Sequence, residues 1–249
     1  MAQHLVFAHG FTQTARSWTP IERLLAVRLP GSTHCAVDLP GHGAAARLRR
    51  DLWGAADHLT SVGGRGTYVG YSMGGRVALH AALRHPEHVD RLVVIGATAG
   101  LETERERAER RAADQALADR VTRQSLAAFL EDWLSNPLFA GLTDETAQRD
   151  DRLRNTRAGL ASSLRLFGTG TQEPLWDRLG EIDCPTLVLV GEHDAKFRVI
   201  GERLATGIAD AQLRVIDGAG HSVHLERPEA TADEIADFVR RQSPDRPRS

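Results

Sequence analysis

The sequence of 249 residues contains only two cysteines, Cys35 and Cys184, and no apolar run long enough to cross a bilayer. Each cysteine enters or lies in a short apolar run, where a buried thiol is the expected state, so no disulfide framework is implied. Lysine plus arginine (31) nearly balance aspartate plus glutamate (33), which leaves no strong field for nucleic acid or an anionic membrane. The start at Met1 has neither a basic nor a long apolar stretch. We expect a soluble, cytoplasmic protein without membrane insertion.

Signatures of metal and phosphate binding are also missing. Neither HExxH nor CxxC occurs in the chain. The glycines at 63, 64 and 66 lack the lysine and hydroxyl residue that complete a phosphate-binding loop. We therefore expect no metal and no cofactor.

Short apolar or β-branched runs alternate with longer amphipathic ones along most of the chain. The short runs show little polar alternation, which is typical of parallel strands buried on both faces. This order predicts a doubly wound α/β sheet with right-handed crossovers. The expected strands are residues 5–8, 35–37, 67–69, 92–95, 187–190 and 213–216, and the expected helices are roughly 17–27, 52–62, 74–83, 200–208 and 229–240.

The alternation stops between about Leu101 and Asp183, where no strand pattern occurs and Glu, Arg, Ala and Leu dominate. We expect a helical lid over residues 101–183, inserted into a core formed by residues 1–100 and 184–242. An insertion at this point lies over the carboxyl ends of the strands, where open α/β sheets bind ligands. Residues 243–249, with two prolines and mixed charge, are expected to be a disordered tail.

The motif that carries chemistry is Gly70-Tyr71-Ser72-Met73-Gly74, which fits Gly-x-Ser-x-Gly. It directly follows an expected strand and opens an expected helix, as in the nucleophile elbow of the α/β-hydrolase fold. Glycines let the neighbouring backbone approach closely in such a turn, and the serine hydroxyl is left at a helix N-terminus. The alternative is a glycine-rich turn with an incidental serine.

A nucleophilic serine needs a base and an acid that orients the base, and in this fold they follow in the order Ser, Asp, His. Asp194 and His221 each come just after an expected strand, which places both at the carboxyl edge of the sheet. Asp217 is an alternative acid, but it precedes His221 by only four residues. The neighbouring His193 and His224 are alternatives of lower rank, with His224 expected at the surface or behind the site. The remaining histidines, His34, His58, His80, His85 and His88, are expected to be structural.

Two backbone N–H groups are required where negative charge develops on the substrate oxygen. One is expected from Met73, just after the serine. The other is expected from Phe11, in the loop after the first strand that faces the elbow in this fold.

The lid region carries the arginine-rich segment at 104–111, which composition alone predicts to be a solvated helix face paired with its own glutamates. Several runs nevertheless resemble the 2-succinyl-6-hydroxy-2,4-cyclohexadiene-1-carboxylate (SHCHC) synthases of menaquinone biosynthesis, which belong to the α/β-hydrolase superfamily. The resemblance extends from His9 to Pro228. Its motifs are residues 70–76 (GYSMGGR), 106–110 (ERAER), 132–133 (DW) with 137–139 (PLF), 168–176 (GTGTQEPLW) and 191–197 (GEHDAKF).

The resemblance implies a triad of Ser72, Asp194 and His221 and a set of substrate-binding residues. That set comprises Tyr71, Arg76, Arg110, Trp133, Arg154, Lys196 and Phe197. Glu173 departs from the usual residue in its stretch, which affects fine substrate contacts rather than the chemistry.

The implied activity is a carbon–oxygen lyase that eliminates pyruvate from 2-succinyl-5-enolpyruvoyl-6-hydroxy-3-cyclohexene-1-carboxylate, with the serine acting as a base. This small molecule carries three carboxylates, and arginine forks bind carboxylates in a bidentate manner. Two alternatives stay open: a serine hydrolase of esters or C–C bonds on the same fold, and a ligand-binding receptor without turnover. The sequence makes no prediction of the oligomeric state.

Overall fold

The computed structural model describes residues 3–241 and shows one parallel six-stranded sheet in the order β2-β1-β3-β4-β5-β6. All six expected strands are present. The chain passes from β1 to β2 on one side and then returns to β3 on the other, so the order reverses beside β1. Ligands bind at such a reversal, outside the carboxyl ends of the strands. The strands are β1 (His4–Ala8), β2 (Thr33–Val37), β3 (Gly66–Tyr71), β4 (Val89–Ile95), β5 (Thr186–Gly191) and β6 (Ala211–Ile216).

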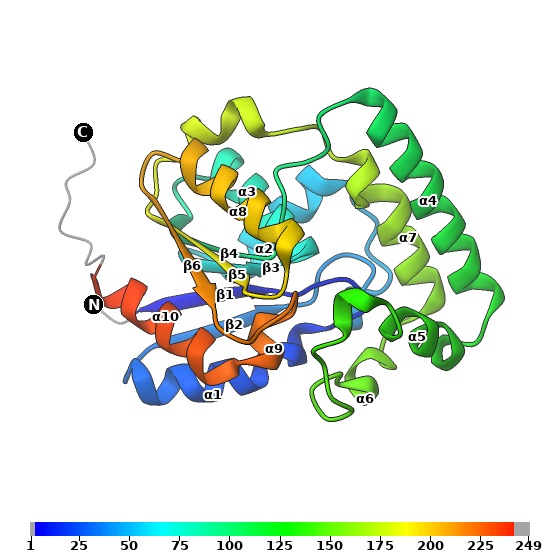
Figure 1. Ribbon diagram of the computed structural model, residues 1–249, viewed down its shortest axis with the longest axis horizontal. Coiled ribbons are helices and arrows are strands. Elements are labelled where there is room, and N and C mark those ends of the chain that lie inside the picture. The colour runs from blue at the N-terminus through cyan, green and yellow to red at the C-terminus, as the bar shows by residue number, and fades with distance from the viewer. Residues whose placement is uncertain (1–2, 242–249) are drawn as a thin grey trace.

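Helices cover both faces of the sheet (Figure 1). On one side lie α1 (Thr19–Arg28) and α10 (Pro228–Arg241), and on the other lie α2 (Leu52–Gly63), α3 (Met73–Arg84) and α8 (Ala195–Gly207). Alternate residues of β1 enter the two cores: Val6 and Ala8 pack with α2 and α3, whereas Leu5 and Phe7 pack with α1 and α10. The central strands are therefore buried on both faces, as their unbroken apolar sequences predict.

The two edge strands differ from this pattern. Most residues of β2 and β6 are only partly buried, because each strand has a neighbour on one side alone. Polar residues such as His34 and Arg214 are tolerated there.

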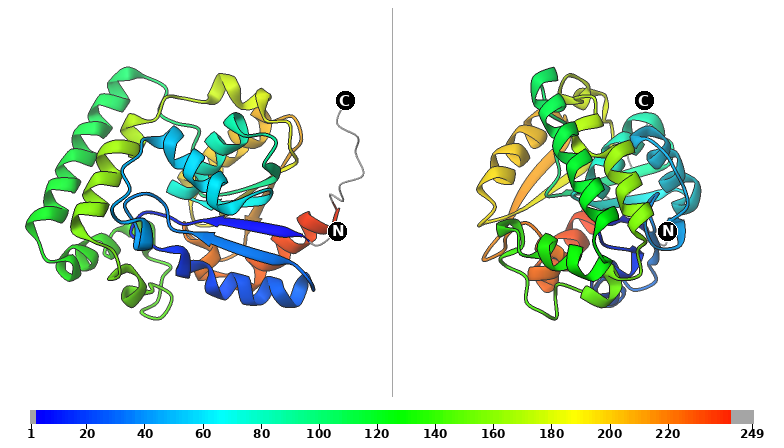
Figure 2. Two further views of the ribbon diagram at one scale, coloured as in Figure 1. Left: turned by 180° about the vertical axis from the view of Figure 1, so that it is seen from behind. Right: turned by 90° about the vertical axis from the view of Figure 1, so that its right-hand side faces the viewer.

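Between β4 and β5 the described chain contains helices and no strand. The long helix α4 (Glu104–Arg123) packs against α7 (Arg157–Phe167), and the pair stands beside the sheet rather than on a face (Figures 1 and 2). Ala118 and Val121 of α4 form a small separate core with Leu160 and Leu164 of α7. The other helices of this segment are α5 (Leu126–Leu134) and α6 (Arg149–Arg152), with short 3₁₀ turns at Pro137–Phe139, Thr169–Thr171 and Trp176–Glu181.

Two further features complete the fold. A short helix, α9 (Val223–Glu226), links the loop after β6 to α10, and 3₁₀ turns occur at Ala15–Trp18 and Gly43–Ala45. Among residues 3–241, every helix is too short or too polar to cross a membrane. The expected tail at 243–249 lies outside the described residues.

Candidate active site

Ser72 sits at the sharp turn between β3 and α3 with φ 51° and ψ −108°, a backbone conformation that non-glycine residues rarely adopt. The flanking glycines are required by close packing. A Cβ atom on Gly70 would lie 2.4 Å from the carbonyl oxygen of Gly74, and one on Gly74 would lie 2.1 Å from the carbonyl oxygen of Ala8. The elbow geometry predicted from the sequence is confirmed, and the strain is held by packing against β1.

Asp194 and His221 are joined by a hydrogen bond of 2.6 Å between Asp194 Oδ2 and His221 Nδ1. Asp194 is also the N-cap of α8, where its Oδ1 accepts the N–H of Phe197 at 3.2 Å. One carboxylate oxygen thus fixes the side chain on its helix while the other holds the imidazole. Because Nδ1 faces the carboxylate, Nε2 of His221 is the nitrogen free to exchange a proton with substrate or serine.

Ser72 and His221 line the same cavity of about 190 Å³. Ser72 N–H donates to the carbonyl oxygen of Ile95 at 2.8 Å. His221 packs over Gly96, which follows Ile95 in the chain, so both residues contact the end of β4. No hydrogen bond joins Ser72 Oγ to His221 within residues 3–241. In ligand-free sites of this kind the contact between nucleophile and base is often long and tightens when substrate binds.

The two residues expected to supply N–H groups for an oxyanion, Phe11 and Met73, line the same cavity as the serine. Met73 is the first residue of α3, where the helix leaves its N–H groups without intrahelical partners. Phe11 lines the cavity from the loop after β1. That loop is held rigidly, because Gly10 N–H donates to Gln13 Oε1 at 2.8 Å and Leu39 N–H donates to His9 Nε2 at 3.0 Å.

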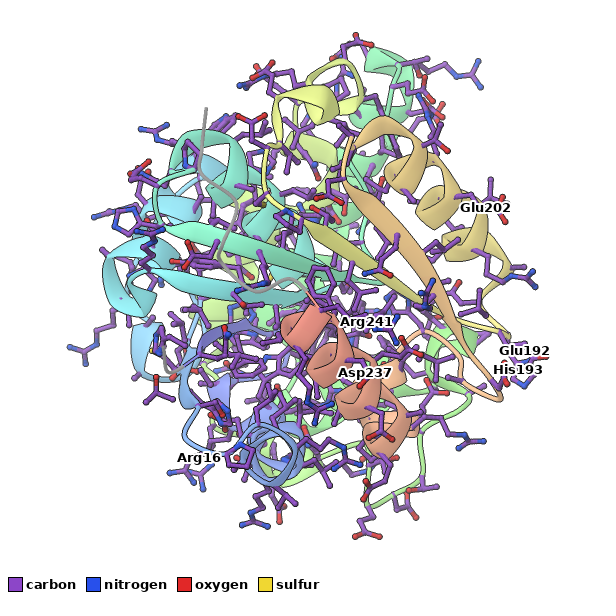
Figure 3. The ribbon with its side chains drawn as sticks, turned by 90° about the vertical axis from the view of Figure 1, so that its left-hand side faces the viewer. Arg16, Glu192, His193, Glu202, Asp237 and Arg241 are labelled. Atoms are coloured by element: carbon purple, nitrogen blue, oxygen red, sulfur yellow. The ribbon has the colours of Figure 1, made fainter. Side chains whose placement is uncertain are left out.

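The rival residues are placed elsewhere. His193 and Glu192 lie exposed at the tip of the loop after β5, at the outer margin of the molecule (Figure 3). Asp217 is exposed, so it is not the acid that holds His221. His224 is fully buried against Tyr71 and Trp18, so of the two expected positions it takes the one behind the site and not the one at the surface. Burial lowers the pKa of His224 to about 3, so its ring is neutral.

Four cationic side chains line the cavity: Arg76, Arg110, Arg152 and Lys196. Arg110 is paired with the buried Asp114, its Nε lying 2.8 Å from Oδ1. Arg76 instead donates to neutral oxygens, namely Phe167 O at 3.0 Å and Gln172 Oε1 at 3.4 Å. Burial lowers the pKa of Arg76 to about 10, with a further contribution from the nearby Arg110.

Arg152 lines the cavity, whereas Arg154, which the sequence interpretation assigned to the site, does not. The Arg154 side chain is 53% exposed, beside Asp151, and is absent from the cavity wall. Arg152 is 1% exposed, and it donates to Ala147 O at 2.7 Å and to Thr12 Oγ1. Arg152 is the last residue of α6, whereas Arg154 follows that helix in a turn. Sequence spacing alone gave no signal for choosing between them.

The rest of the wall is aromatic. Phe197 packs on the His221 ring with centroids 4.5 Å apart, and Tyr71 OH shares a 2.7 Å hydrogen bond with Ser222 Oγ. Trp133 packs edge-on against Phe11 at 5.1 Å, and its buried Nε1–H has no partner among the described residues.

One group of side chains in the described part of the chain could hold a metal ion. Donor atoms of His85, Glu87 and His88 lie within 4.8 Å of one another. They lie between α3 and β4, at the amino end of the sheet, opposite the edge that carries Ser72. They therefore play no part in the candidate site.

Comparisons with known proteins identify relatives that span nearly the whole chain. The model of the alpha/beta hydrolase family matches residues 5–234. The chain is 36% identical to the SHCHC synthase of Salmonella schwarzengrund (strain CVM19633), covering 96% of this chain and 94% of the relative. The solved structure of MenH from S. aureus has a TM-score of 0.86 at 30% identity, covering 96% of this chain and 94% of that one. A thermophilic esterase from Thermogutta terrifontis shares the fold, with a TM-score of 0.83 at 24% identity, covering 97% and 91%.

Proposed function

The chain belongs to the α/β-hydrolase family and, within it, to the SHCHC synthases, and on that premise we propose that it eliminates pyruvate from 2-succinyl-5-enolpyruvoyl-6-hydroxy-3-cyclohexene-1-carboxylate. The products are pyruvate and SHCHC. The proposal concerns both the substrate and the residues that act on it.

The observation that carries the proposal is the pair of buried guanidinium groups, Arg76 and Arg152, that face the Ser72 cavity without a carboxylate within 4 Å among residues 3–241. A buried charge without a counter-ion is costly to the free protein, so such a site favours an anionic ligand that supplies the missing charge. Lys196 and Arg110 add two more cations at the wall. The substrate brings three carboxylates, whereas a simple neutral ester brings none.

We assign the chemistry to the triad as follows. His221, held by Asp194, takes the Ser72 hydroxyl proton on Nε2, and Ser72 Oγ then removes the proton from C2 of the ring, next to the succinyl ketone. The N–H groups of Phe11 and Met73 stabilise the enolate oxygen that forms.

The electron pair released at C2 then completes the elimination. It forms the C2–C3 double bond, the old C3–C4 double bond moves to C4–C5, and the bond between C5 and the enolpyruvyl oxygen breaks. The departing enolate takes up the proton carried by His221 and becomes pyruvate. No water is consumed, so the helical segment between β4 and β5 acts as a lid that keeps the site dry.

The decisive experiment supplies the purified protein with the enolpyruvoyl substrate and follows pyruvate with lactate dehydrogenase. We expect turnover by the wild type and loss of turnover in Ser72→Ala. A serine hydrolase would instead turn over simple aryl esters rapidly, through an acylated Ser72, and release no pyruvate. A receptor without turnover would give the same result for wild type and Ser72→Ala.

We extend the proposal to the binding partner of the protein and to its location in the cell. The partner is the small tricarboxylate itself, and the reaction takes place in the cytoplasm. Cell fractionation with an antibody to the native protein tests the location, and detection in the membrane pellet after a salt wash would contradict it.

A further inference from the structure

We propose that Glu226 is a positioning residue for His221: its carboxylate accepts the backbone N–H groups on both sides of that residue. Oε2 accepts from Gly220 at 2.6 Å, and Oε1 accepts from Ser222 at 2.9 Å. The two bonds bracket the residue whose side chain must stand between Asp194 and Ser72. This inference rests on the proposed function in so far as it assigns His221 the role of base.

The carboxylate is enclosed. Glu226 is the last residue of α9 and is 9% exposed. A Cβ atom on Gly141, from the segment between β4 and β5, would lie 2.0 Å from Oε2, and one on Gly220 would lie 3.1 Å from it. A side chain at 141 would have to displace the carboxylate, so the inserted segment packs directly on this group and covers it.

The hydrogen bonds of the Glu226 carboxylate indicate that it positions the loop and is not buried only as part of the packing. No cation lies within 4 Å of the Glu226 carboxylate in the described part of the chain, and its two oxygens accept hydrogen bonds from the loop N–H groups of Gly220 and Ser222. Hydrogen bonds from N–H groups to an ionised carboxylate are short and about twice as strong as those to a neutral acceptor. A neutral side chain in this place would cost less free energy to bury than a carboxylate. It would not accept hydrogen bonds from both N–H groups through two separate oxygens.

Two further hydrogen bonds hold the loop that carries His221, but of the two residues that flank His221 they involve only Ser222, whereas the Glu226 carboxylate accepts the N–H groups of both. Glu226 N–H returns to the carbonyl oxygen of Ser222 at 2.9 Å, which closes a compact ring of backbone and side chain. Ser222 Oγ meets Tyr71 OH at 2.7 Å, which ties the ring to the elbow. The base and the elbow serine are therefore set relative to each other through a short chain of hydrogen bonds.

Glu226→Gln is the sharpest test because it preserves shape. A carboxamide offers one acceptor oxygen, so one of the two N–H groups faces the NH₂ group and loses its partner. A displacement of the imidazole by about 1 Å lowers kcat by about 10²-fold, with KM unchanged, because the arginines and aromatic residues of the pocket are untouched. Glu226→Asp keeps two acceptors and should regain part of the loss.

Glu192→Gln is the matched control. Glu192 Oε2 accepts the N–H of Gly218 at 2.8 Å, in the same loop, but it is exposed and does not flank His221. This variant should keep wild-type kcat. Equal losses in both variants, or a loss in Glu226→Gln that follows its unfolded fraction in a thermal melt, would overturn the proposal.

A second measurement separates this inference from the proposed function. The rate at which a fluorophosphonate labels Ser72 depends on the base and the N–H groups but not on the natural substrate. We expect Glu226→Gln to slow labelling and to shift the low-field proton resonance of the His221–Asp194 hydrogen bond, whereas Glu192→Gln changes neither. If Glu226→Gln slows labelling but the wild type releases no pyruvate, the proposed substrate is wrong and the positioning role of Glu226 stands. If Glu226→Gln labels at the wild-type rate, the positioning role of Glu226 is wrong.

Discussion

Asp194 and His221 are 27 residues apart in the chain, yet Oδ2 of the first lies 2.6 Å from Nδ1 of the second. They meet because β5 and β6 are parallel neighbours, so the loops that follow them emerge at one edge of the sheet. The carboxylate fixes the tautomer and the orientation of the imidazole. Four predictions follow from this geometry and from the cavity beside it.

Asp194→Asn should lower kcat for pyruvate release by about 10³- to 10⁴-fold, because an amide that donates to Nδ1 selects the wrong tautomer of His221. Asp217→Asn, an equivalent change at an exposed site on the next loop, should leave kcat at the wild-type value. Steady-state kinetics with the lactate dehydrogenase assay measure both. A loss of equal size in Asp217→Asn would show that the acid has been assigned to the wrong residue.

Arg152→Met should raise KM about 10-fold or more, because a hydrogen bond to a charged group contributes about 1.5 to 3 kcal/mol. Arg154→Met serves as the control and should leave KM unchanged, since its exposed side chain lies away from the cavity. Thermal melts of both variants confirm folding. The reverse result, a high KM in Arg154→Met alone, would restore the residue expected from the sequence.

Ser72→Gly should abolish pyruvate release and stabilise the fold by about 1 kcal/mol. The positive φ of Ser72 costs on the order of 1 to 3 kcal/mol, and glycine removes that strain against an entropy cost of about 0.5 to 1 kcal/mol. Ser72→Ala keeps the strain and should show no such gain. Urea unfolding gives the comparison, and equal stability of the two variants would contradict a strained elbow.

Lowering the pH below about 6.5 should destabilise the protein, in part through His224. Burial lowers the pKa of His224 to about 3, compared with 6.5 for an ordinary histidine. Between these two values the unfolded chain binds a proton that the folded chain does not, so the free energy of unfolding falls as the pH falls. Urea midpoints between pH 5 and 7 measure the slope.

His224→Phe keeps the ring packing on Tyr71 and removes the titrating group, so its slope should fall by about one proton. His193→Phe, at an exposed position, should leave the slope unchanged. If both variants show the slope of the wild type, the buried ring is not a source of the pH dependence.

The sequence by itself determined the sheet, the helices on its two faces and the edge of the sheet at which Ser72, Asp194 and His221 lie. Unbroken apolar runs specify buried parallel strands, and parallel strands deliver the residues after them to one edge, so Ser72, Asp194 and His221 could be brought together before any coordinates were known. Gly74 carries the same information, because only glycine permits the close contact with Ala8 that the elbow requires.

Tertiary structure decided the residues around the triad. Arg152 and Arg154 are two positions apart in an arginine-rich stretch, and only the packing of α6 against the loop after β1 buries one and exposes the other. His224 and Glu226 are polar residues two positions apart, and both are buried. Their burial depends on contacts with Gln13, Tyr71 and Gly141, which are distant in the chain, and no local pattern encodes such contacts.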